Sequence, residues 1–220
     1  MALVWVLVVV LSCAVGVGCK KPQAAPPASP APQVNVSEGT STETGADLSG
    51  KNVLMVVAPK GIRAEEYREP RSAFEGAGAK VTVASVSAGE AILTDKTTIA
   101  VDIAAADADP AKFDVVIFVG GPGMAKHLNE PSFVELARKC KEREKIVVGA
   151  ICVAPAILAH AGLLNGKKAT AWRSQLPTLK AAGATIVDSP VVRDGNIVTA
   201  NGPPAAKEFA RTLVAAAAEL

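Results

Sequence analysis

Cys152 is the residue whose type and surroundings best suit chemistry. It follows the apolar run KIVVGAI and precedes the alanine-rich run VAPAILAHAGLL. The residues two positions to either side of it, Ala150 and Ala154, are small, and Pro155 follows where a helix would begin. This spacing is typical of a nucleophile elbow, a sharp turn from a strand to a helix with the nucleophile at its apex. The other interpretation of Cys152 is a buried structural thiol, which is a common fate of free cysteine.

A strand and a helix must flank such a cysteine, and the sequence from residue 51 onward supplies both. Continuous apolar runs, typical of strands buried on both faces, alternate with helical patterns. The expected strands are NVLMVVAP, KVTVASV, DVVIFVGG, KIVVGAI, KKATAW, ATIVD and GNIVTAN, and the expected helices span residues 70–77, 131–144, 154–161, 175–182 and 205–220. Residues 89–104 lack helical spacing and predict a small β-hairpin or an extended excursion. The alternation predicts an α/β fold with a mostly parallel sheet and helices on both faces.

Three turns that follow expected strands carry unusual residues, and ligands of such sheets bind at the carboxyl ends of the strands. These turns are APKGIRAEEYREP, VGGPGMAKH and GAICVAP. Taken alone, Glu65 and Glu66 are interpreted as solvated charges at the start of a helix, where acids are favoured, and the glycines as parts of a tight turn.

The motifs AICVAP, VGGPG, EEYREP and AGAKVTVAS together resemble the ThiJ/PfpI superfamily over residues 51–220. The resemblance implies a flavodoxin-like three-layer sandwich related to class I glutamine amidotransferases. It also implies, by position, that Cys152 is the reactive cysteine and that Glu66 is the carboxylate of the family's site. The backbone amides of Gly120 and Gly121 are expected to border the pocket.

The histidines depart from the pattern of the family. Protease-like members place a histidine directly after the cysteine, where this chain has Val153, whose backbone amide we expect to complete the pocket. Another branch supplies a histidine at a position where this chain has Trp172, which is expected to wall a small apolar pocket. His127 could approach the site, although a surface histidine is the simpler interpretation, and His160 is expected at the far end of its helix. A peptidase mechanism therefore loses its usual general base.

Two classes of function stay open. The first is a cysteine-dependent enzyme, glyoxalase-like, deglycase-like or hydrolase-like, that acts on small carbonyl or acyl substrates through a Cys152 thiolate paired with Glu66. The second is a non-catalytic redox-sensing or ligand-binding domain. A protonated Glu66 donating to sulfur, together with helix amides, predicts a pKa of Cys152 well below the free-thiol value of about 8.5. No cofactor and no metal are expected in either case.

The first 50 residues predict export rather than core structure. The apolar run MALVWVLVVVLSCAVGVGC at residues 1–19 resembles a signal peptide that ends in the lipobox of bacterial lipoproteins, so we expect lipidation of Cys19. Residues 20–50, rich in Pro, Ala, Ser and Thr, then form a tether in the cell envelope that holds the domain on the periplasmic or exterior side. A soluble secreted product is one alternative. An uncleaved anchor is another, with Lys20 and Lys21 kept in the cytoplasm.

The remaining expectations concern partners and thiol pairing. A net charge of +2 argues against nucleic acid as the main partner. The family resemblance implies a homodimer. Cys140 and Cys152 are expected near opposite ends of one strand, about 17–20 Å apart by strand rise. A disulfide needs Cα atoms within about 7 Å, so both thiols are expected to be unpaired.

Overall fold

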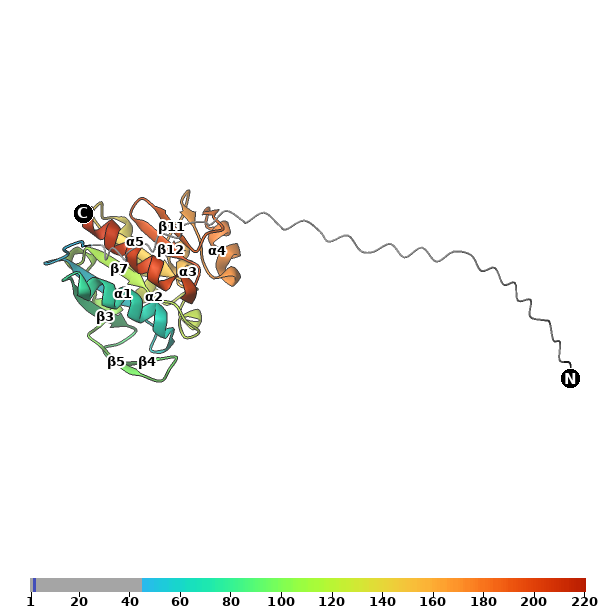
Figure 1. Ribbon diagram of the computed structural model, residues 1–220, viewed down its shortest axis with the longest axis horizontal. Coiled ribbons are helices and arrows are strands. Elements are labelled where there is room, and N and C mark those ends of the chain that lie inside the picture. The colour runs from blue at the N-terminus through green and yellow to red at the C-terminus, as the bar shows by residue number, and fades with distance from the viewer. Residues whose placement is uncertain (1, 3–44) are drawn as a thin grey trace, which may run out of the picture. The chain divides into compact units, whose positions relative to one another are not determined.

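The computed structural model describes residue 2 and residues 45–220 of the chain (Figure 1). The lipidation site Cys19, the leader apart from residue 2, and the tether up to residue 44 lie outside the described residues, so the expectations about them stay predictions. In the part of the chain that the structure describes, no helix is both long enough and apolar enough to cross a membrane.

A seven-stranded sheet forms the centre of residues 45–220, with the strand order β11-β12-β8-β7-β1-β3-β6. The neighbouring pairs are parallel except β11 and β12, which are antiparallel. The strands are β1 (Asn52–Val56), β3 (Lys80–Ser85), β6 (Ile103–Ala104), β7 (Val115–Phe118), β8 (Val147–Ile151), β11 (Val191–Asp194) and β12 (Ile197–Ala200). The chain leaves β1 toward β3 and leaves β7 toward β8 on the opposite side, so the topological switch point lies between β1 and β7.

Helices cover both faces of this sheet. They are α1 (Ala64–Gly76), α2 (Pro131–Lys141), α3 (Pro155–His160), α4 (Leu176–Ala181) and α5 (Ala206–Ala218), with short 3-10 turns η1 (Ala105–Asp107), η2 (Pro110–Lys112), η3 (Met124–Lys126), η4 (Arg173–Gln175) and η5 (Pro203–Ala205). Right-handed crossovers running in opposite directions from the switch point place α1 and α2 on opposite faces. Helix α5 packs beside α1, and α3 packs beside α2 (Figure 1). The predicted flavodoxin-like three-layer fold is confirmed.

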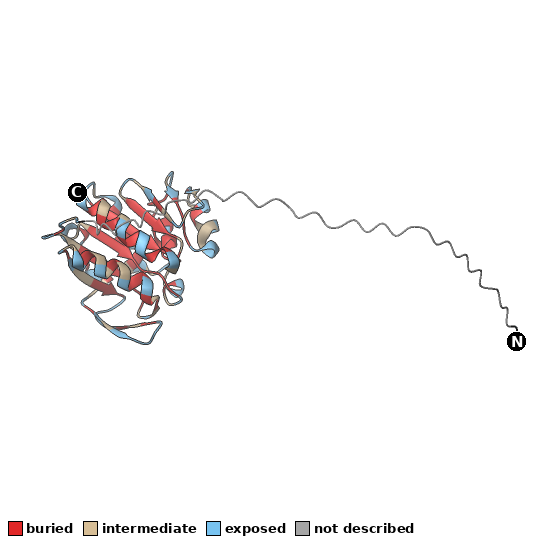
Figure 2. Ribbon diagram, viewed as in Figure 1, coloured by how far each residue is buried: buried red, intermediate tan, exposed pale blue. Residues whose placement is uncertain are grey.

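The core follows from the apolar runs. The central strands β1, β7 and β8 are buried almost throughout, as Figure 2 shows, because helices cover both of their faces. The core also includes Leu48, which is 1% exposed and whose N–H donates to Ala77 O at 2.8 Å. The folded domain therefore begins a few residues before residue 51, within the last part of the segment expected to be a tether.

The hairpin expected at residues 89–104 is present. Strands β4 (Gly89–Leu93) and β5 (Thr98–Val101) pair antiparallel, and β2 (Lys60–Ile62) adds to β4 in a separate three-stranded sheet. Strand β6, which follows β5, joins the central sheet beside β3. The hairpin therefore reaches away from the main sheet and contacts the segment that follows β1.

The prediction of elements was wrong in three places. Helix α1 begins at Ala64 and not at Pro70, which lies inside it. The runs KKATAW and ATIVD contribute only a small separate pair, β9 (Lys168–Ala169) with β10 (Thr185–Ile186), so they are not strands of the central sheet. The antiparallel edge strand β11 was missed, because its sequence VVRD has only two apolar residues.

Candidate active site

Cys152 lies directly after β8 at the apex of a sharp turn into α3. Its φ of 63° falls in the left-handed region, which costs a non-glycine residue about 1–3 kcal/mol. Its N–H donates to Ala200 O at 2.9 Å, and its carbonyl accepts from the N–H of Trp172 at 2.8 Å. Both backbone groups are thus fixed by neighbouring segments, and the thiol is held in place with the residue 7% exposed.

Gly120 lies between Cys152 and Glu66. A Cβ at Gly120 would lie 2.5 Å from Glu66 Oε2 and 2.6 Å from Cys152 Cβ, closer than real Cβ contacts. Gly120 follows β7, Cys152 follows β8, and Glu66 lies in the helix α1 that follows β1 and β2; β1 and β8 flank β7 in the sheet. The absence of a side chain at Gly120 therefore lets the carboxyl and the thiol approach each other.

Glu66 is a fully buried carboxyl in the first turn of α1. Burial raises its pKa to about 7, against the opposing influences of the Cys152 thiol, the positive charge of Arg63 and the amide of Gly120. Neither Oε1 nor Oε2 has a partner at hydrogen-bonding geometry. The group is therefore a carboxylic acid below neutral pH and can exchange its proton near pH 7.

The structure contradicts the expectation of a strongly acidic thiol at Cys152. Burial first, and then the negative charge of Glu66, raise the pKa of the Cys152 thiol to about 12. The backbone amides at the elbow lower this pKa, but their effect is smaller than that of burial. Because a carboxylate and a thiolate side by side repel each other, the pair keeps one proton above pH 7.

Two backbone amides favour negative charge on the sulfur. The N–H groups of Gly121 and Val153 lower the pKa of Cys152, whereas the amide of Gly120 acts on Glu66 instead. Gly121 has a φ of 119°, and a Cβ there would lie 2.5 Å from Arg63 N. The expected backbone pocket is therefore divided, with two amides at the sulfur and one at the carboxyl.

The two histidines make contacts of their own. His127 Nδ1 lies 3.9 Å from Glu130 Oε2, and its ring centroid is 6.2 Å from that of Phe133. His160 Nδ1 lies 3.0 Å from Leu128 O, near the end of α3. Within residues 45–220, no hydrogen bond or ion pair joins either histidine to the thiol or the carboxyl of the site.

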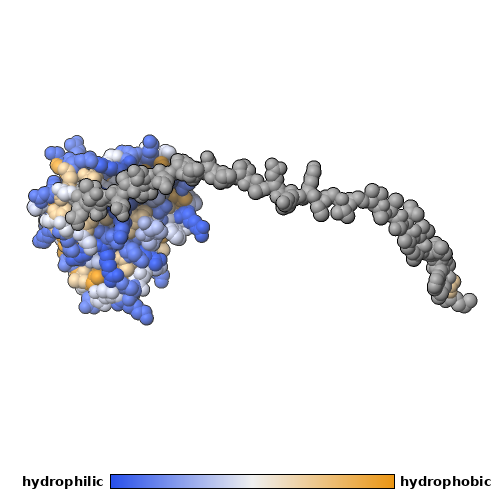
Figure 3. All heavy atoms as spheres, viewed as in Figure 1, coloured by the Kyte–Doolittle hydropathy of each residue, from blue (hydrophilic) through white to orange (hydrophobic). Residues whose placement is uncertain are grey.

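Trp172 lines a groove of about 550 Å³. The residue is 43% exposed, and a Cβ at Gly202 would lie 3.0 Å from its ring, so the indole lies against that backbone. Polar side chains cover most of the face of the domain seen in Figure 3, with small apolar patches between them. The groove is lined by Thr170, Ala171, Trp172, Arg173, Leu176, Ile186, Val187, Asp188, Pro190, Asn201, Pro204, Ala205 and Glu208. Cys152 is not among these residues, so the groove is joined to the elbow through the backbone hydrogen bond from Trp172 to Cys152.

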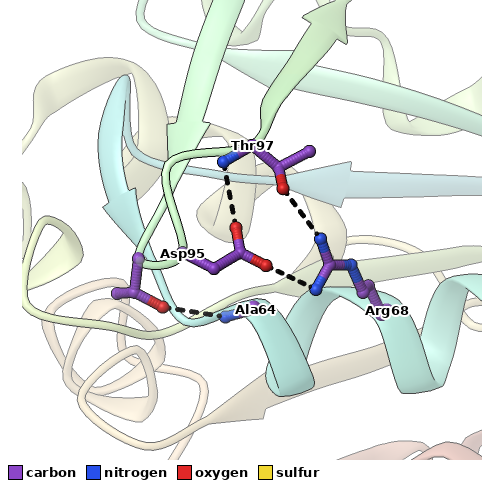
Figure 4. A network of polar contacts seen from close by, with 5 residues as sticks. Ala64, Arg68, Asp95 and Thr97 are labelled. Atoms are coloured by element: carbon purple, nitrogen blue, oxygen red, sulfur yellow. Dashed lines mark hydrogen bonds and ion pairs between the residues drawn. The ribbon is translucent and has the colours of Figure 1, made fainter.

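The β4–β5 hairpin holds the first turn of α1 in place (Figure 4). Thr94 Oγ1 accepts a hydrogen bond from the N–H of Ala64 at 3.4 Å, where the helix has no side-chain cap of its own. One turn along, Arg68 Nη1 lies 2.6 Å from Asp95 Oδ2. Glu66 lies between these two attachments in the sequence, so the hairpin restrains the backbone that carries the buried carboxyl.

The two cysteines among the described residues are unpaired, as predicted. Cys140 lies near the end of α2 and is 1% exposed, and burial raises its pKa to about 12. It lies away from the elbow, among residues such as Val148 and Asn165. It therefore provides an internal reference thiol for experiments on Cys152.

The similarity of this chain to known proteins identifies its family. A profile of the DJ-1/PfpI family matches residues 51–216, from β1 to the last turn of α5. The chain belongs to the DJ-1/PfpI family. It is 36% identical to protein dj-1beta of Drosophila melanogaster over 161 residues, which are 73% of this chain and 86% of that protein. It is 34% identical to a deglycase of Thermococcus kodakarensis over 152 residues, which are 68% of this chain and 90% of that protein.

The solved structures agree with the family assignment. The crystal structure of a ThiJ/PfpI domain protein from Brachyspira murdochii superposes with a TM-score of 0.74 and 32% sequence identity. The match covers 78% of this chain and 99% of the other. The crystal structure of Drosophila melanogaster DJ-1beta matches with a TM-score of 0.69 and 32% identity, over 77% of this chain and 91% of the other.

Two features of this DJ-1/PfpI domain were missed in the sequence. A Cβ at Gly123 would lie 1.6 Å from Lys60 O, so the turn after β7 packs directly on the backbone of β2. The three glycines of VGGPG and the KG of PKGIR were visible signals of close backbone approach. The second feature is Arg63, just before α1, whose charge acts on Glu66. A single basic residue in a turn gives no pattern from which to predict this.

Proposed function

We propose that this chain is a cysteine-dependent enzyme that acts on small carbonyl compounds, with Cys152 as nucleophile and Glu66 as the group that carries the proton. The supporting observation is a fully buried Glu66 with a pKa of about 7 against a buried thiol. A group of this pKa is suited both to accept and to donate a proton at neutral pH. The proposal also agrees with the 34% identity to a protein named as a deglycase.

The first step adds the thiol to an aldehyde carbon. The Glu66 carboxylate takes the thiol proton as Sγ bonds to carbon, and the electron pair of the carbonyl bond moves to oxygen. The carboxylic acid then returns the proton to that oxygen, so a neutral thiohemiacetal forms. The amides of Gly121 and Val153, which already favour negative charge on sulfur, stabilise charge as it develops.

A 2-oxoaldehyde can go further on the same groups. Glu66 moves a proton from the former aldehyde carbon to the adjacent carbonyl carbon, through an enediol, which leaves a 2-hydroxy thioester. Water then cleaves the thioester, releases a 2-hydroxy acid and restores the Cys152 thiol. No external oxidant or reductant is needed, because one carbon is oxidised and its neighbour is reduced.

Consumption of methylglyoxal by the full-length chain tests this function. Cys152→Ser and Glu66→Gln should each lower the rate by at least about 100-fold, while Cys140→Ser, which alters a thiol outside the site, should leave it unchanged. Equal rates in the wild type and Cys152→Ser would refute the proposal.

The second candidate is a non-catalytic ligand-binding or redox-sensing domain. One observation favours it: Trp172 stands at a position at which some relatives are expected to supply a histidine, and it lines the groove while its N–H is bonded to the carbonyl of Cys152. Absence of turnover with a panel of aldehydes, together with saturable binding in the Trp172 groove, would support this candidate.

We also propose that lipidated Cys19 tethers the domain in the cell envelope and that the chain forms a homodimer. The support is the lipobox-like VGVGC in the first case and the family in the second. Fatty-acid labelling should disappear in Cys19→Ala, and a chain that is never labelled would contradict the tether. A monomeric mass in light scattering at micromolar concentration would contradict the dimer.

A further inference from the structure

Unsatisfied polar atoms are concentrated beside the candidate nucleophile. Among the described residues, the buried side-chain nitrogen and oxygen atoms without a hydrogen-bond partner are Nε of Arg63, both carboxyl oxygens of Glu66, and Nε of Arg143. Buried polar groups are normally hydrogen-bonded, since an unpaired one costs desolvation energy. Three of the four atoms belong to two residues at the start of α1, so this cluster needs a physical explanation.

Arg63 is built into the same turn as the site. Its backbone N–H donates to Gly120 O at 3.3 Å, and Gly120 is the residue that separates the Glu66 carboxyl from Cys152. The neighbouring Gly121 approaches the Arg63 nitrogen so closely that a Cβ there would lie 2.5 Å from it. The backbone of Arg63 therefore lies against the two glycines next to Cys152 and Glu66, and its side chain starts there.

The guanidinium of Arg63 has no carboxylate partner within the described chain. Arg68 and Arg71, on the same helix, each form an ion pair, with Asp95 and Glu75 respectively. Arg63 lies close enough to Glu66 to lower the pKa of that carboxyl, yet no ion pair forms between them. A positive charge that acts on Glu66, the neighbour of the thiol, thus has no ion-pair partner within the described chain.

We propose that Arg63 binds the carboxylate of a substrate whose carbonyl carbon is attacked by Cys152, so that the site prefers 2-oxo acids such as glyoxylate to neutral aldehydes. This inference deepens the proposed function and rests on it. A planar guanidinium binds carboxylates through paired charge-assisted hydrogen bonds, which gives orientation as well as affinity. With glyoxylate, the Sγ–C bond forms and the carbonyl oxygen receives the thiol proton through Glu66, which yields a thiohemiacetal that keeps its carboxylate on Arg63.

Alkylation of the full-length chain with two reagents tests anion recognition without turnover. Iodoacetate and iodoacetamide both form an S–C bond and release iodide, but only iodoacetate carries a carboxylate. We expect Arg63→Gln to lower the ratio of the iodoacetate rate to the iodoacetamide rate at Cys152 by about tenfold, because it removes a charge-assisted hydrogen bond. Arg138→Gln, which removes the same charge from an exposed pair with Glu135, should leave the ratio unchanged.

A second variant and a second measurement keep the test decisive if Arg63→Gln does not fold. Arg63→Lys keeps the positive charge but loses the planar guanidinium that can form paired hydrogen bonds, so it should give an intermediate ratio. In the wild type, glyoxylate should protect Cys152 from iodoacetamide at a concentration about tenfold lower than methylglyoxal does. Equal protection by both compounds, or a ratio that Arg63 variants do not change, would overturn the proposal.

The two proposals fail in different ways. If the alkylation ratio depends on Arg63 but the wild type turns over no carbonyl compound, recognition by Arg63 stands and catalysis is refuted. If the wild type consumes methylglyoxal but the alkylation ratio does not depend on Arg63, catalysis stands and recognition by Arg63 is refuted.

Discussion

The carboxyl of Glu66 and the side chain of Cys152 meet across a single glycine. A methyl group on Gly120 would lie within 2.6 Å of both, at 2.5 Å from Oε2 and 2.6 Å from the cysteine Cβ. Cys152 follows β8 and Glu66 lies in the helix that follows β1 and β2, while Gly120 follows β7, the strand between β1 and β8. The properties of the pair therefore depend on a backbone position that has no side chain.

Gly120→Ala should separate the pair. The added methyl must displace either the carboxyl or the thiol, and overpacking of this kind costs about 1–3 kcal/mol of stability. We expect loss of most of the Cys152-dependent activity and a lower melting temperature. Gly76→Ala, where a Cβ meets nothing within 4 Å, is the matched control and should retain both. Full activity in Gly120→Ala would mean that the pair does not act as a unit.

Stability should fall as the pH rises through the titration of Glu66. The pKa of the carboxyl is raised from its ordinary 4.5 to about 7, so the folded state holds a proton that the unfolded state has released. The stabilisation is fully present below pH 4.5 and is lost progressively up to about pH 7. Its size is about 3 kcal/mol as an order of magnitude. Urea unfolding across this range should show the loss in the wild type relative to Glu66→Gln, whereas parallel curves would contradict it.

The alkylation rate of Cys152 should depend on the protonation state of Glu66 and not on a low pKa of the thiol. Alkylation by iodoacetamide should rise with a midpoint near pH 7, where the carboxylate forms and can accept the thiol proton. Glu66→Gln removes this base and should leave a profile that rises only toward alkaline pH. Cys140, which is also buried and has no carboxylate among the influences on its pKa, should react slowly throughout. A rate that is already maximal at pH 5 would instead support the acidic thiolate expected from the sequence.

Trp172 should affect binding more than chemistry if its groove holds the remainder of the substrate. Trp172→Ala removes the aromatic wall, and burial of one such contact is worth about 1 kcal/mol or more, so KM for a bulky aldehyde should rise roughly five- to tenfold. The kcat should change by less than about twofold. Val86→Ala, at the other exposed large hydrophobic residue of the described chain, should change neither value. A fall in kcat with KM unchanged would place Trp172 in the chemistry instead.

The sequence predicted the scaffold well because apolar runs and elbow spacing are local. The run before Cys152 and the small residues around it define a buried strand and a tight turn without reference to the rest of the chain. The start of α1 was predicted at Pro70, because proline is best tolerated in the first helical turn. The helix in fact starts six residues earlier, where Thr94 of the hairpin caps it. That cap is a long-range contact, so no local pattern announces it.

The electrostatics of the site were the least predictable part. The start of a helix suggested an acidic thiol, but the pKa of Cys152 depends first on burial, which only the folded chain determines. The same holds for Arg63, which is one of several basic residues in the sequence and gains significance only through its attachment to Gly120. Charge–charge effects depend on distances between strand ends, and these distances are set by the sheet order.

The strained backbone of Cys152 has a consequence for any screen that ranks variants by melting temperature. Glycine adopts a φ of 63° freely, so Cys152→Gly relieves the strain and should unfold at a higher temperature than the wild type. Such a variant has no thiol and hence no chemistry at this position. Selection for thermal robustness or soluble yield alone would therefore favour the inactive chain over the active one, and only an assay of the reaction would distinguish them.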